Sequence, residues 1–367
     1  MSPAAVAPRE AAPAKQPRPG RSDVRRHLLD GQVIPAQPLA LDAARRIDER
    51  YQRGLTRYYL ASGAGGLAVG VHTTQFEIRE HGLLPAVLEL ASETIDDCLA
   101  RTPRSFVKIA GVCGRTAQAV REAQTARRLG YDAGLLSLAA WGESEEQDIL
   151  RHCAEIADIL PLVGFYLQPS VGGRLLSHRF WQRFAEIDNV VAIKIAPFNR
   201  YHTLDVVRAV AESGRTDIAL YTGNDDNIIV DLLTEYAFPA LGCGSRRQIV
   251  GGLLGQWAVW TYRAVEMLER IKVVRRQDSV EAAWLTLSAA LTDANAAIFD
   301  VRERFAGCIP GIHEVLRRQG LMPGVWCLNP GEVLSPGQSD EIDRIWHAYP
   351  HLRDDEFIEA HRDEWLR

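Results

Sequence analysis

The sequence predicts an α/β fold, namely a (β/α)8 or TIM barrel followed by a C-terminal helical extension. Eight short apolar segments alternate with segments of helical periodicity between residues 33 and 243, which is the count and size of such a barrel. No G-x-G-x-x-G follows an early strand, which argues against a doubly wound nucleotide-binding sheet. After Gly255 the pattern becomes purely helical, with segments at 257–276, 280–305, 312–319 and 340–347.

The expected elements follow in order along the chain. Strands are expected at 33–41, 66–71, 106–113, 133–138, 162–167, 190–196, 218–222 and 239–243. Helices are expected at 42–61, after the second strand through about Ala100, and at 116–129, 144–159, 177–187, 204–212 and 226–236. We expect Asp42 to cap the first of these helices, because its carboxylate can accept from free backbone amides. Gly130 is expected to end the third helix.

Composition limits the kind of protein this can be. Of the 367 residues 47% are hydrophobic and the formal net charge is −5, so we expect a large core and neither nucleic-acid nor membrane partners. Residues 1–20 are rich in Ala and Pro without an apolar signal core, so we expect a disordered tail, a barrel at 21–255 and a helical region at 256–367. The six cysteines are dispersed, which favours reduced cytoplasmic thiols over disulfides or a zinc site.

One lysine interrupts the apolar strand at 190–196. A lone ammonium in an apolar wall is costly, and burial lowers its pKa, which yields the neutral amine that Schiff-base chemistry needs. Lys194 is one of only four lysines and lies three residues before Pro197, near the catalytic face of a barrel. Lys108, the rival, lies nearer the middle or the N-terminal end of its strand. The alternative is that Lys194 snorkels to solvent or pairs with a carboxylate.

Other chemistry-bearing side chains fall at the expected strand ends. Tyr166 lies one strand before Lys194 and is a candidate proton relay, although interfacial tyrosines are commoner. His72 can titrate near neutral pH, and the backbone amides of its turn can hold a carboxylate. Asp225 and Asp226 could be metal ligands, but just before a helix we interpret them as N-cap and first-turn residues and expect no metal site.

The chain resembles the dihydrodipicolinate synthase and N-acetylneuraminate lyase family over roughly residues 33 to 334. The segments that carry the resemblance are Val191-Ala192-Ile193-Lys194, Phe165-Tyr166-Leu167-Gln168-Pro169 with Gly173, and Ile109-Ala110-Gly111-Val112. The turn Thr222-Gly223-Asn224-Asp225 and the stretch Cys308-Ile309-Pro310 fit more loosely. The resemblance implies a class I aldolase or lyase with Lys194 as the Schiff-base lysine, Tyr166 as the relay, no cofactor and a homo-oligomer, dimer or tetramer.

Departures from the family pattern predict a different second substrate. The family's G-T-T-G-E turn is here Gly70-Val71-His72-Thr73-Thr74, and the P-Y-Y segment is Leu138-Ala139-Ala140. Val171 stands where true dihydrodipicolinate synthases have a carboxylate-binding arginine, and valine cannot replace that clamp. We therefore expect a reaction other than that of dihydrodipicolinate synthase. The predicted substrate-binding residues are His72, Thr73, Thr74, Trp141, Arg174 and Gly223.

The predicted activity is a Schiff-base lyase or aldolase. Pyruvate or another 2-oxoacid would form an imine with Lys194, and a C–C bond to an aldehyde-type substrate would form or break. Two alternatives remain open from the residues: an imine-dependent hydratase or dehydratase, and a non-catalytic ligand-binding paralogue. Replacing Lys194 by arginine separates the second from the others, because only an imine enzyme requires a deprotonated amine.

Overall fold

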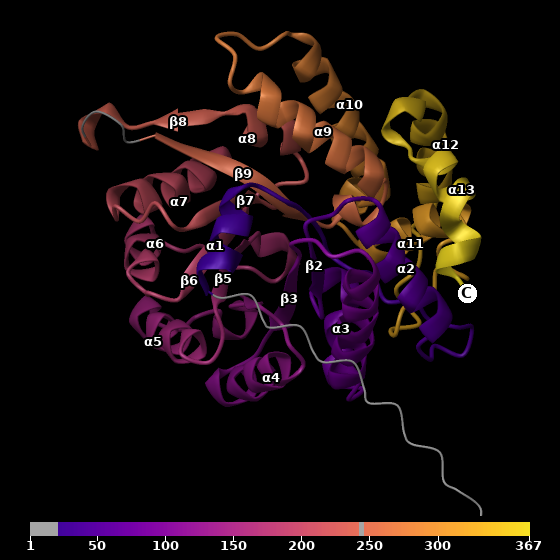
Figure 1. The fold of residues 1–367 in the computed structure, drawn as a ribbon, viewed down its shortest axis with the longest axis horizontal. Helices are drawn as coiled ribbons and strands as arrows, with labels where there is room; N and C mark the ends of the chain where they lie inside the picture. The colour runs from indigo at the N-terminus through magenta and orange to yellow at the C-terminus, as the bar shows by residue number, and fades with distance from the viewer. Residues whose placement is uncertain (1–20, 242–245) are drawn as a thin grey trace, which may run out of the picture.

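The computed structural model describes residues 21–241 and 246–367, and shows a barrel of eight parallel strands surrounded by helices (Figure 1). The predicted tail at 1–20 lies outside these residues. The barrel strands are β1 (Val33–Pro35), β2 (Gly66–Val69), β3 (Val107–Val112), β4 (Ala133–Leu136), β5 (Leu162–Leu167), β6 (Val190–Ala196), β7 (Ala219–Thr222) and β9 (Arg246–Leu254). They pair in the order β1-β9-β7-β6-β5-β4-β3-β2.

The ring closes between β1 and β2. Ala36 bridges Ala68 in parallel, and the backbone N–H of Gln37 donates to the Ala68 carbonyl at 2.9 Å. Outside the strands run α2 (Glu49–Ala61), α3 (Leu84–Arg101), α4 (Thr116–Arg128), α5 (Glu146–Ala157), α6 (His178–Ala185), α7 (Arg200–Glu212) and α8 (Ile228–Leu233). The predicted (β/α)8 barrel is therefore confirmed.

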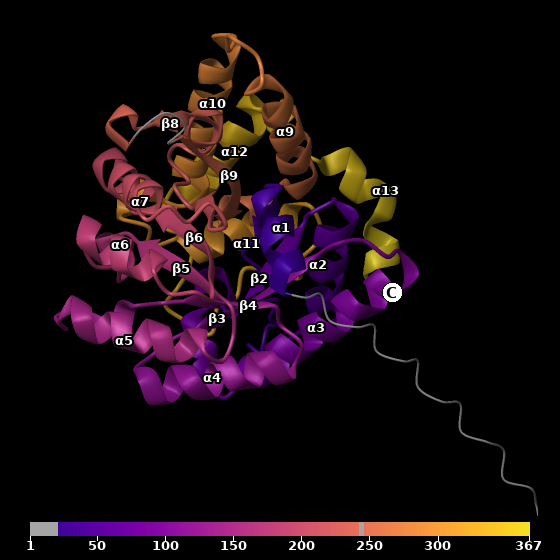
Figure 2. The same cartoon turned by 60° about the vertical axis from the view of Figure 1, so that its left-hand side comes forward.

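The C-terminal helices form a group on one side of the barrel (Figures 1 and 2). They are α9 (Thr261–Val274), α10 (Ala283–Ile298), α11 (Cys308–Arg318), α12 (Gln338–Ala348) and α13 (Asp355–Trp365). Helix α10 packs against α8 and α12, and α13 packs against α2. No helix in the described part of the chain is long and apolar enough to cross a membrane.

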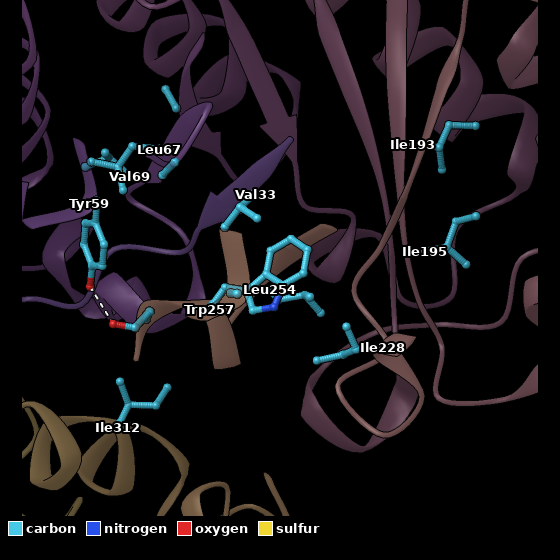
Figure 3. Close-up of a cluster of buried hydrophobic side chains, with 14 of the residues drawn as sticks. Val33, Tyr59, Leu67, Val69, Ile193, Ile195, Ile228, Leu254, Trp257 and Ile312 are labelled. Carbon is cyan, nitrogen blue, oxygen red and sulfur yellow. Dashed lines mark hydrogen bonds between the residues drawn. The ribbon is translucent and has the colours of Figure 1, made fainter. Parts of the chain in front are cut away.

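Two apolar layers lie on opposite faces of the strands. The inner layer fills the barrel with side chains such as Ile109, Phe165 and Tyr221. The outer layer joins the strands to the helices and includes Ile193 and Ile195, which Figure 3 shows with their neighbours. Because successive strand residues point to opposite faces, this alternation fixes which side chains enter the barrel.

An N-terminal helix, α1 (Arg21–Leu29), closes the end of the barrel where the strands begin. Val24 and Leu28 belong to the inner layer, and Arg25 donates to the carbonyl of Val190, the first residue of β6, at 3.1 Å. The Tyr221 hydroxyl donates to the Leu28 carbonyl at 2.8 Å from inside the barrel. Helix α1 does not cover the opposite end of the barrel, where the strands finish and where an active site is expected.

The eighth strand was predicted in the wrong place. Residues Pro239–Leu241 form a short 3-10 turn, and residues 242–243 lie outside the described part of the chain. The eighth barrel strand is β9, whose first residues pair with the antiparallel β8 (Glu235–Ala237) before the strand enters the barrel. The first residues of β9, Arg246-Arg247-Gln248, are polar because they are partly exposed in the hairpin. The start of this strand therefore shows no apolar run in the sequence.

The first predicted helix begins later than expected. Helix α2 starts at Glu49, and Asp48 is its N-cap, with its side chain accepting from the Tyr51 N–H at 3.2 Å. Asp42 instead closes a tight loop, because its carboxylate accepts from the backbone N–H groups of Ala44 and Arg46. The predicted N-cap at Asp42 is therefore wrong, although the type of interaction expected of it is present.

Candidate active site

Lys194 lies on the inner face of β6. All seven residues of this strand are buried, and Lys194 is 9% exposed. Its neighbours Ile193 and Ile195 face the outer layer (Figure 3), so the lysine side chain points into the barrel. The ammonium nitrogen is 4.4 Å from the centroid of the Phe165 ring, which comes from the opposing position on β5.

Burial changes the protonation of this amine. Desolvation lowers the pKa of Lys194 from 10.5 to about 8, and the negative charge of Asp225 limits the decrease. The Phe165 ring also favours the ammonium form, since an aromatic face attracts a cation. With a pKa this close to neutrality, a useful fraction of the amine is unprotonated and nucleophilic at physiological pH.

Gly223, from the loop after β7, packs directly against the lysine. A Cβ at this position would lie 2.6 Å from Lys194 Cε and 2.8 Å from Ala196 Cβ, so only glycine fits here. The Gly223 N–H donates to the Ile195 carbonyl at 2.7 Å, which ties the loop to β6. The predicted site residues Lys194 and Gly223 are therefore brought together.

The loop that carries Gly223 is held by a buried carboxylate. Asp231, at 1% exposure, accepts from the Thr222 hydroxyl at 2.7 Å, from Asn224 Nδ2 at 2.9 Å and from Asn227 Nδ2 at 2.9 Å. Arg200 completes the cluster as its ion-pair partner. A loop satisfied at so many polar atoms presents its remaining side chains in one fixed geometry.

Asp225, interpreted from the sequence as an N-cap, lies instead in the loop that carries Gly223. Its Oδ1 accepts from the Gln256 N–H at 3.1 Å, and its carbonyl accepts from Asn295 Nδ2 at 2.7 Å. Helix α8 begins only at Ile228 with Asn227 as the preceding residue, so the N-cap role expected for Asp225 is wrong. Burial raises the pKa of Asp225, and the charge of Lys194 opposes that increase. The feature of the sequence that could have pointed to Asp225 as a site residue is its position two residues after Gly223.

His72 lies in the short 3-10 turn His72–Thr74 that follows β2. Burial and the nearby positive charge of Lys194 lower the pKa of His72 from 6.5 to about 4, while Glu77 acts in the opposite direction. The ring is therefore neutral at physiological pH, with one nitrogen able to donate and the other to accept. Because it follows β2 directly, this predicted residue lies at the end of the barrel where the strands finish.

Thr73 and Thr74 use their hydroxyl protons within the protein. Thr73 Oγ1 donates to the Ala36 carbonyl at 2.8 Å, and Thr74 Oγ1 donates to the Gln37 carbonyl at 2.7 Å. Thr74 Oγ1 also accepts from the Gly70 N–H at 3.0 Å. These bonds fix the turn to the end of β1, so the two threonines shape the turn that carries His72.

Tyr166 is placed on the other face of β5 from Phe165. It belongs to the outer layer, with its ring 5.2 Å from Trp181 and 6.0 Å from His202 between centroids. Its hydroxyl contacts the backbone N–H and carbonyl of Leu176, each at 3.4 Å. The structure does not bring Tyr166 to Lys194, and the predicted proton relay has no geometric support.

Trp141 and Arg174 contact each other through the Trp141 carbonyl. The Arg174 guanidinium donates to the carbonyls of Trp141 and Ser144, both at 2.8 Å. The Trp141 ring packs 4.7 Å from His152 and 4.5 Å from the Arg115 guanidinium carbon, within the outer layer. Both predicted substrate-binding residues therefore stabilise the turn between β4 and α5.

The fold and this site define a class of protein: a (β/α)8 barrel with a buried, partly neutral lysine at the end where its strands finish. A model of the dihydrodipicolinate synthetase family matches residues 30–236, more than half of the chain. The protein belongs to the dihydrodipicolinate synthetase family. Members of this family are Schiff-base lyases.

Curated relatives are distant and only partly covered. The 4-hydroxy-tetrahydrodipicolinate synthase of Bifidobacterium longum is 25% identical over 207 residues, which are 54% of this chain and 63% of the relative. The synthase of the same name from Acaryochloris marina is 30% identical over 141 residues, 38% of this chain and 46% of the relative. The matched region thus spans less than two thirds of the length of these relatives.

Solved structures share the fold over nearly all their length. YagE, a prophage protein of the dihydrodipicolinic acid synthase family from E. coli K12 in complex with pyruvate, superposes with a TM-score of 0.69 at 17% identity, covering 88% of this chain and 98% of that one. CdNal from Clostridium difficile in complex with mannosamine gives 0.68 at 17% identity, with 87% and 99% covered. At this identity the similarity establishes the barrel and its helical extension.

Proposed function

We propose that this protein is a class I lyase or aldolase in which the Lys194 amine forms an imine with pyruvate or another 2-oxoacid. The observation that carries the proposal is the amine itself. It is buried on the inner face of β6 and its pKa is lowered to about 8. A buried lysine with this protonation is poised for nucleophilic attack on a carbonyl carbon.

The imine would then serve as an electron sink for C–C chemistry. The protonated imine withdraws electrons from the carbon adjacent to the C=N carbon, and loss of a proton or of a C–C bond from that adjacent carbon gives a neutral enamine. A C–C bond to that carbon can therefore form or break without a free carbanion. The neutral His72 ring is a candidate donor or acceptor toward the substrate. The first amides of the turn His72–Thr74 have no partner within that turn and are candidates to hold the 2-oxoacid carboxylate.

The second substrate is proposed to differ from that of dihydrodipicolinate synthase. Val171, in the loop after β5, offers no charge where an arginine clamp would be needed. Arg174, the nearest basic residue along the chain, is occupied by two backbone carbonyls. We propose an aldehyde-type partner without a carboxylate at that position. A homo-oligomer and a cytoplasmic location remain predictions of the same proposal.

The test is covalent trapping. The full chain is incubated with pyruvate and with a panel of other 2-oxoacids, reduced with borohydride and analysed by intact mass and peptide mapping. We expect an adduct on Lys194 with at least one 2-oxoacid, and none in Lys194→Ala. Lys108→Ala is the matched control, because Lys108 is also a buried strand lysine, and it should retain the adduct. Absence of any adduct across the panel would overturn the proposal.

A further inference from the structure

A second titratable group, Asp225, lies at the same end of the barrel as Lys194 and has no role in the imine chemistry proposed for the lysine. Strands β6 and β7 are neighbours, with Lys194 opposite Tyr221 and Ile195 opposite Thr222. The chain leaving β7 passes Gly223, which packs on Lys194 Cε, and reaches Asp225 two residues later. Each of these two groups is the strongest charge acting on the other.

We propose that Asp225 is the proton-transfer residue of this site, exchanging protons with the Lys194 nitrogen and with the oxygen of the substrate carbonyl. This inference rests on the proposed imine chemistry. It assigns to Asp225 the role that the family resemblance implied for Tyr166.

The local structure holds Asp225 in place without neutralising it. One carboxylate oxygen is tied to the Gln256 N–H, and the backbone is tied to Asn295 on α10. Among the ion pairs of the described residues, none includes Asp225, whereas its neighbour Asp226 lies 3.7 Å from Arg200. Lys194 and Asp225 interact electrostatically but form no direct ion pair. A substrate oxygen or a water molecule can therefore carry a proton from one to the other.

The protons balance across imine formation. The reactive pair starts as a neutral amine on Lys194 and a carboxylic acid on Asp225, and the nitrogen attacks the carbonyl carbon. A proton moves from nitrogen to the former carbonyl oxygen, through the carboxyl group, to give the carbinolamine. Asp225 then donates its own proton to that hydroxyl group, which leaves as water as the C=N bond forms. The products are an iminium ion and a carboxylate, so net charge is unchanged.

The other candidate groups are less suited to this role. The Tyr166 hydroxyl contacts Leu176 in the outer layer, on the opposite face of the sheet from Lys194. Burial and the Lys194 charge hold the pKa of His72 at about 4, so its ring holds no transferable excess proton at neutral pH. Burial raises the pKa of Asp225 to about 7, near which general acid and general base forms coexist.

The experiment measures the rate of borohydride-trappable adduct formation with pyruvate in Asp225→Asn across pH. Asparagine keeps an oxygen for the Gln256 N–H and removes only the proton exchange and the charge. We expect the rate to fall at least about 100-fold, as for loss of a general acid–base group. Asp226→Asn, its immediate neighbour, is the control: the Asp226 charge raises the pKa of Asp225, so we expect only a small shift of the pH dependence and no 100-fold loss of rate.

The direction in which Asp225→Asn changes the rate of adduct formation distinguishes proton transfer by Asp225 from a purely electrostatic role. The Asp225 charge raises the pKa of Lys194, so removing it makes the amine more often neutral. If Asp225 only tuned that pKa, Asp225→Asn would form the adduct equally fast or faster at pH 7, and the inference would be overturned. If the unaltered protein forms no adduct, the proposed function itself has failed. Unchanged thermal unfolding verifies that the variant is folded.

Discussion

Two lysines of this chain lie within barrel strands with almost the same burial, and they have opposite surroundings. Lys108 on β3 is 8% exposed and Lys194 on β6 is 9% exposed. Lys108 points outward to α3, where its Nζ donates to Asp96 Oδ1 at 2.8 Å and to Ser92 Oγ at 3.0 Å. Lys194 points inward, over the Phe165 ring.

The difference shows that the face of a strand decides the chemistry of a buried lysine more than its exposed fraction does. On the outer face the ammonium of Lys108 reaches Asp96, whose side chain is 63% exposed, so the pair lies at the edge of the solvent. On the inner face Lys194 is in none of the ion pairs of the described residues and is largely removed from solvent. Desolvation without direct pairing lowers a lysine pKa, and this is why we propose Lys194, and not Lys108, as the nucleophile.

The largest effect is expected when each of the two lysines is replaced in turn by arginine, which stays charged at every accessible pH. Lys194→Arg should abolish adduct formation with pyruvate, because a guanidinium cannot lose its proton and cannot form the imine. Lys108→Arg should form the adduct at the rate of the unaltered protein. The measurement is intact mass after borohydride reduction. If Lys194→Arg still bound 2-oxoacids by calorimetry while the unaltered protein formed no adduct, the chain would be a ligand-binding paralogue.

The second effect tests how closely Lys194 must be positioned. In Gly223→Ala the new methyl group would lie 2.6 Å from Lys194 Cε, so the amine must shift. A displacement of about 1 Å at a reacting group can cost on the order of 100-fold in rate, and we expect a decrease of this size in adduct formation. Gly142→Ala is the control, because no atom lies within 4 Å of a Cβ there. Equal rates in both variants would contradict the packing argument.

Most of the barrel could be predicted from the sequence because parallel strands buried on both faces are apolar runs. Strands β3, β5 and β6 fall where Val107–Val112, Leu162–Leu167 and Val190–Ala196 make that signal strong. The eighth strand was predicted at 239–243 and not at β9, because the first residues of β9, Arg246 and Arg247, belong to a partly exposed hairpin outside the barrel. Helix α1 was not predicted, since nothing in its short polar sequence reveals the open barrel end it fills.

The site was predictable only as far as the strand pattern reached. A charge within an apolar run identified Lys194. The prediction of Tyr166 as the proton relay, in contrast, depended on the register between β5 and β6. Lys194 opposes Phe165, and Tyr166 opposes Ile195, so one residue of register separates an inner ring from an outer one. Asp225 was interpreted as an N-cap because its actual partners, Gln256 and Asn295, come from segments 31 and 70 residues away. No local pattern encodes such contacts.

A smaller effect is expected on the pKa of Lys194 when the aromatic ring beside it on the inner face is removed. The Phe165 ring, 4.4 Å from the ammonium, favours the charged form, so Phe165→Leu should lower the Lys194 pKa below its value of about 8. A cation–π contribution of about 0.7 kcal/mol corresponds to about half a pH unit. The midpoint of the pH dependence of adduct formation should move toward acid by that amount. A shift toward alkaline pH would show that leucine changes solvation more than it removes the aromatic contact.

The smallest effect is expected on the outer face. Lys108→Met keeps the length and apolar stem of the side chain but removes its bonds to Asp96 and Ser92. Because Asp96 is largely exposed, solvent already screens the ion pair, and the free energy of unfolding should change by less than about 1 kcal/mol. Urea unfolding at low and high salt measures this, and high salt should shrink any loss. Adduct formation should not change. A loss of several kcal/mol would mean that Lys108 is as isolated from solvent as Lys194, and the contrast between the two faces would then need a different cause.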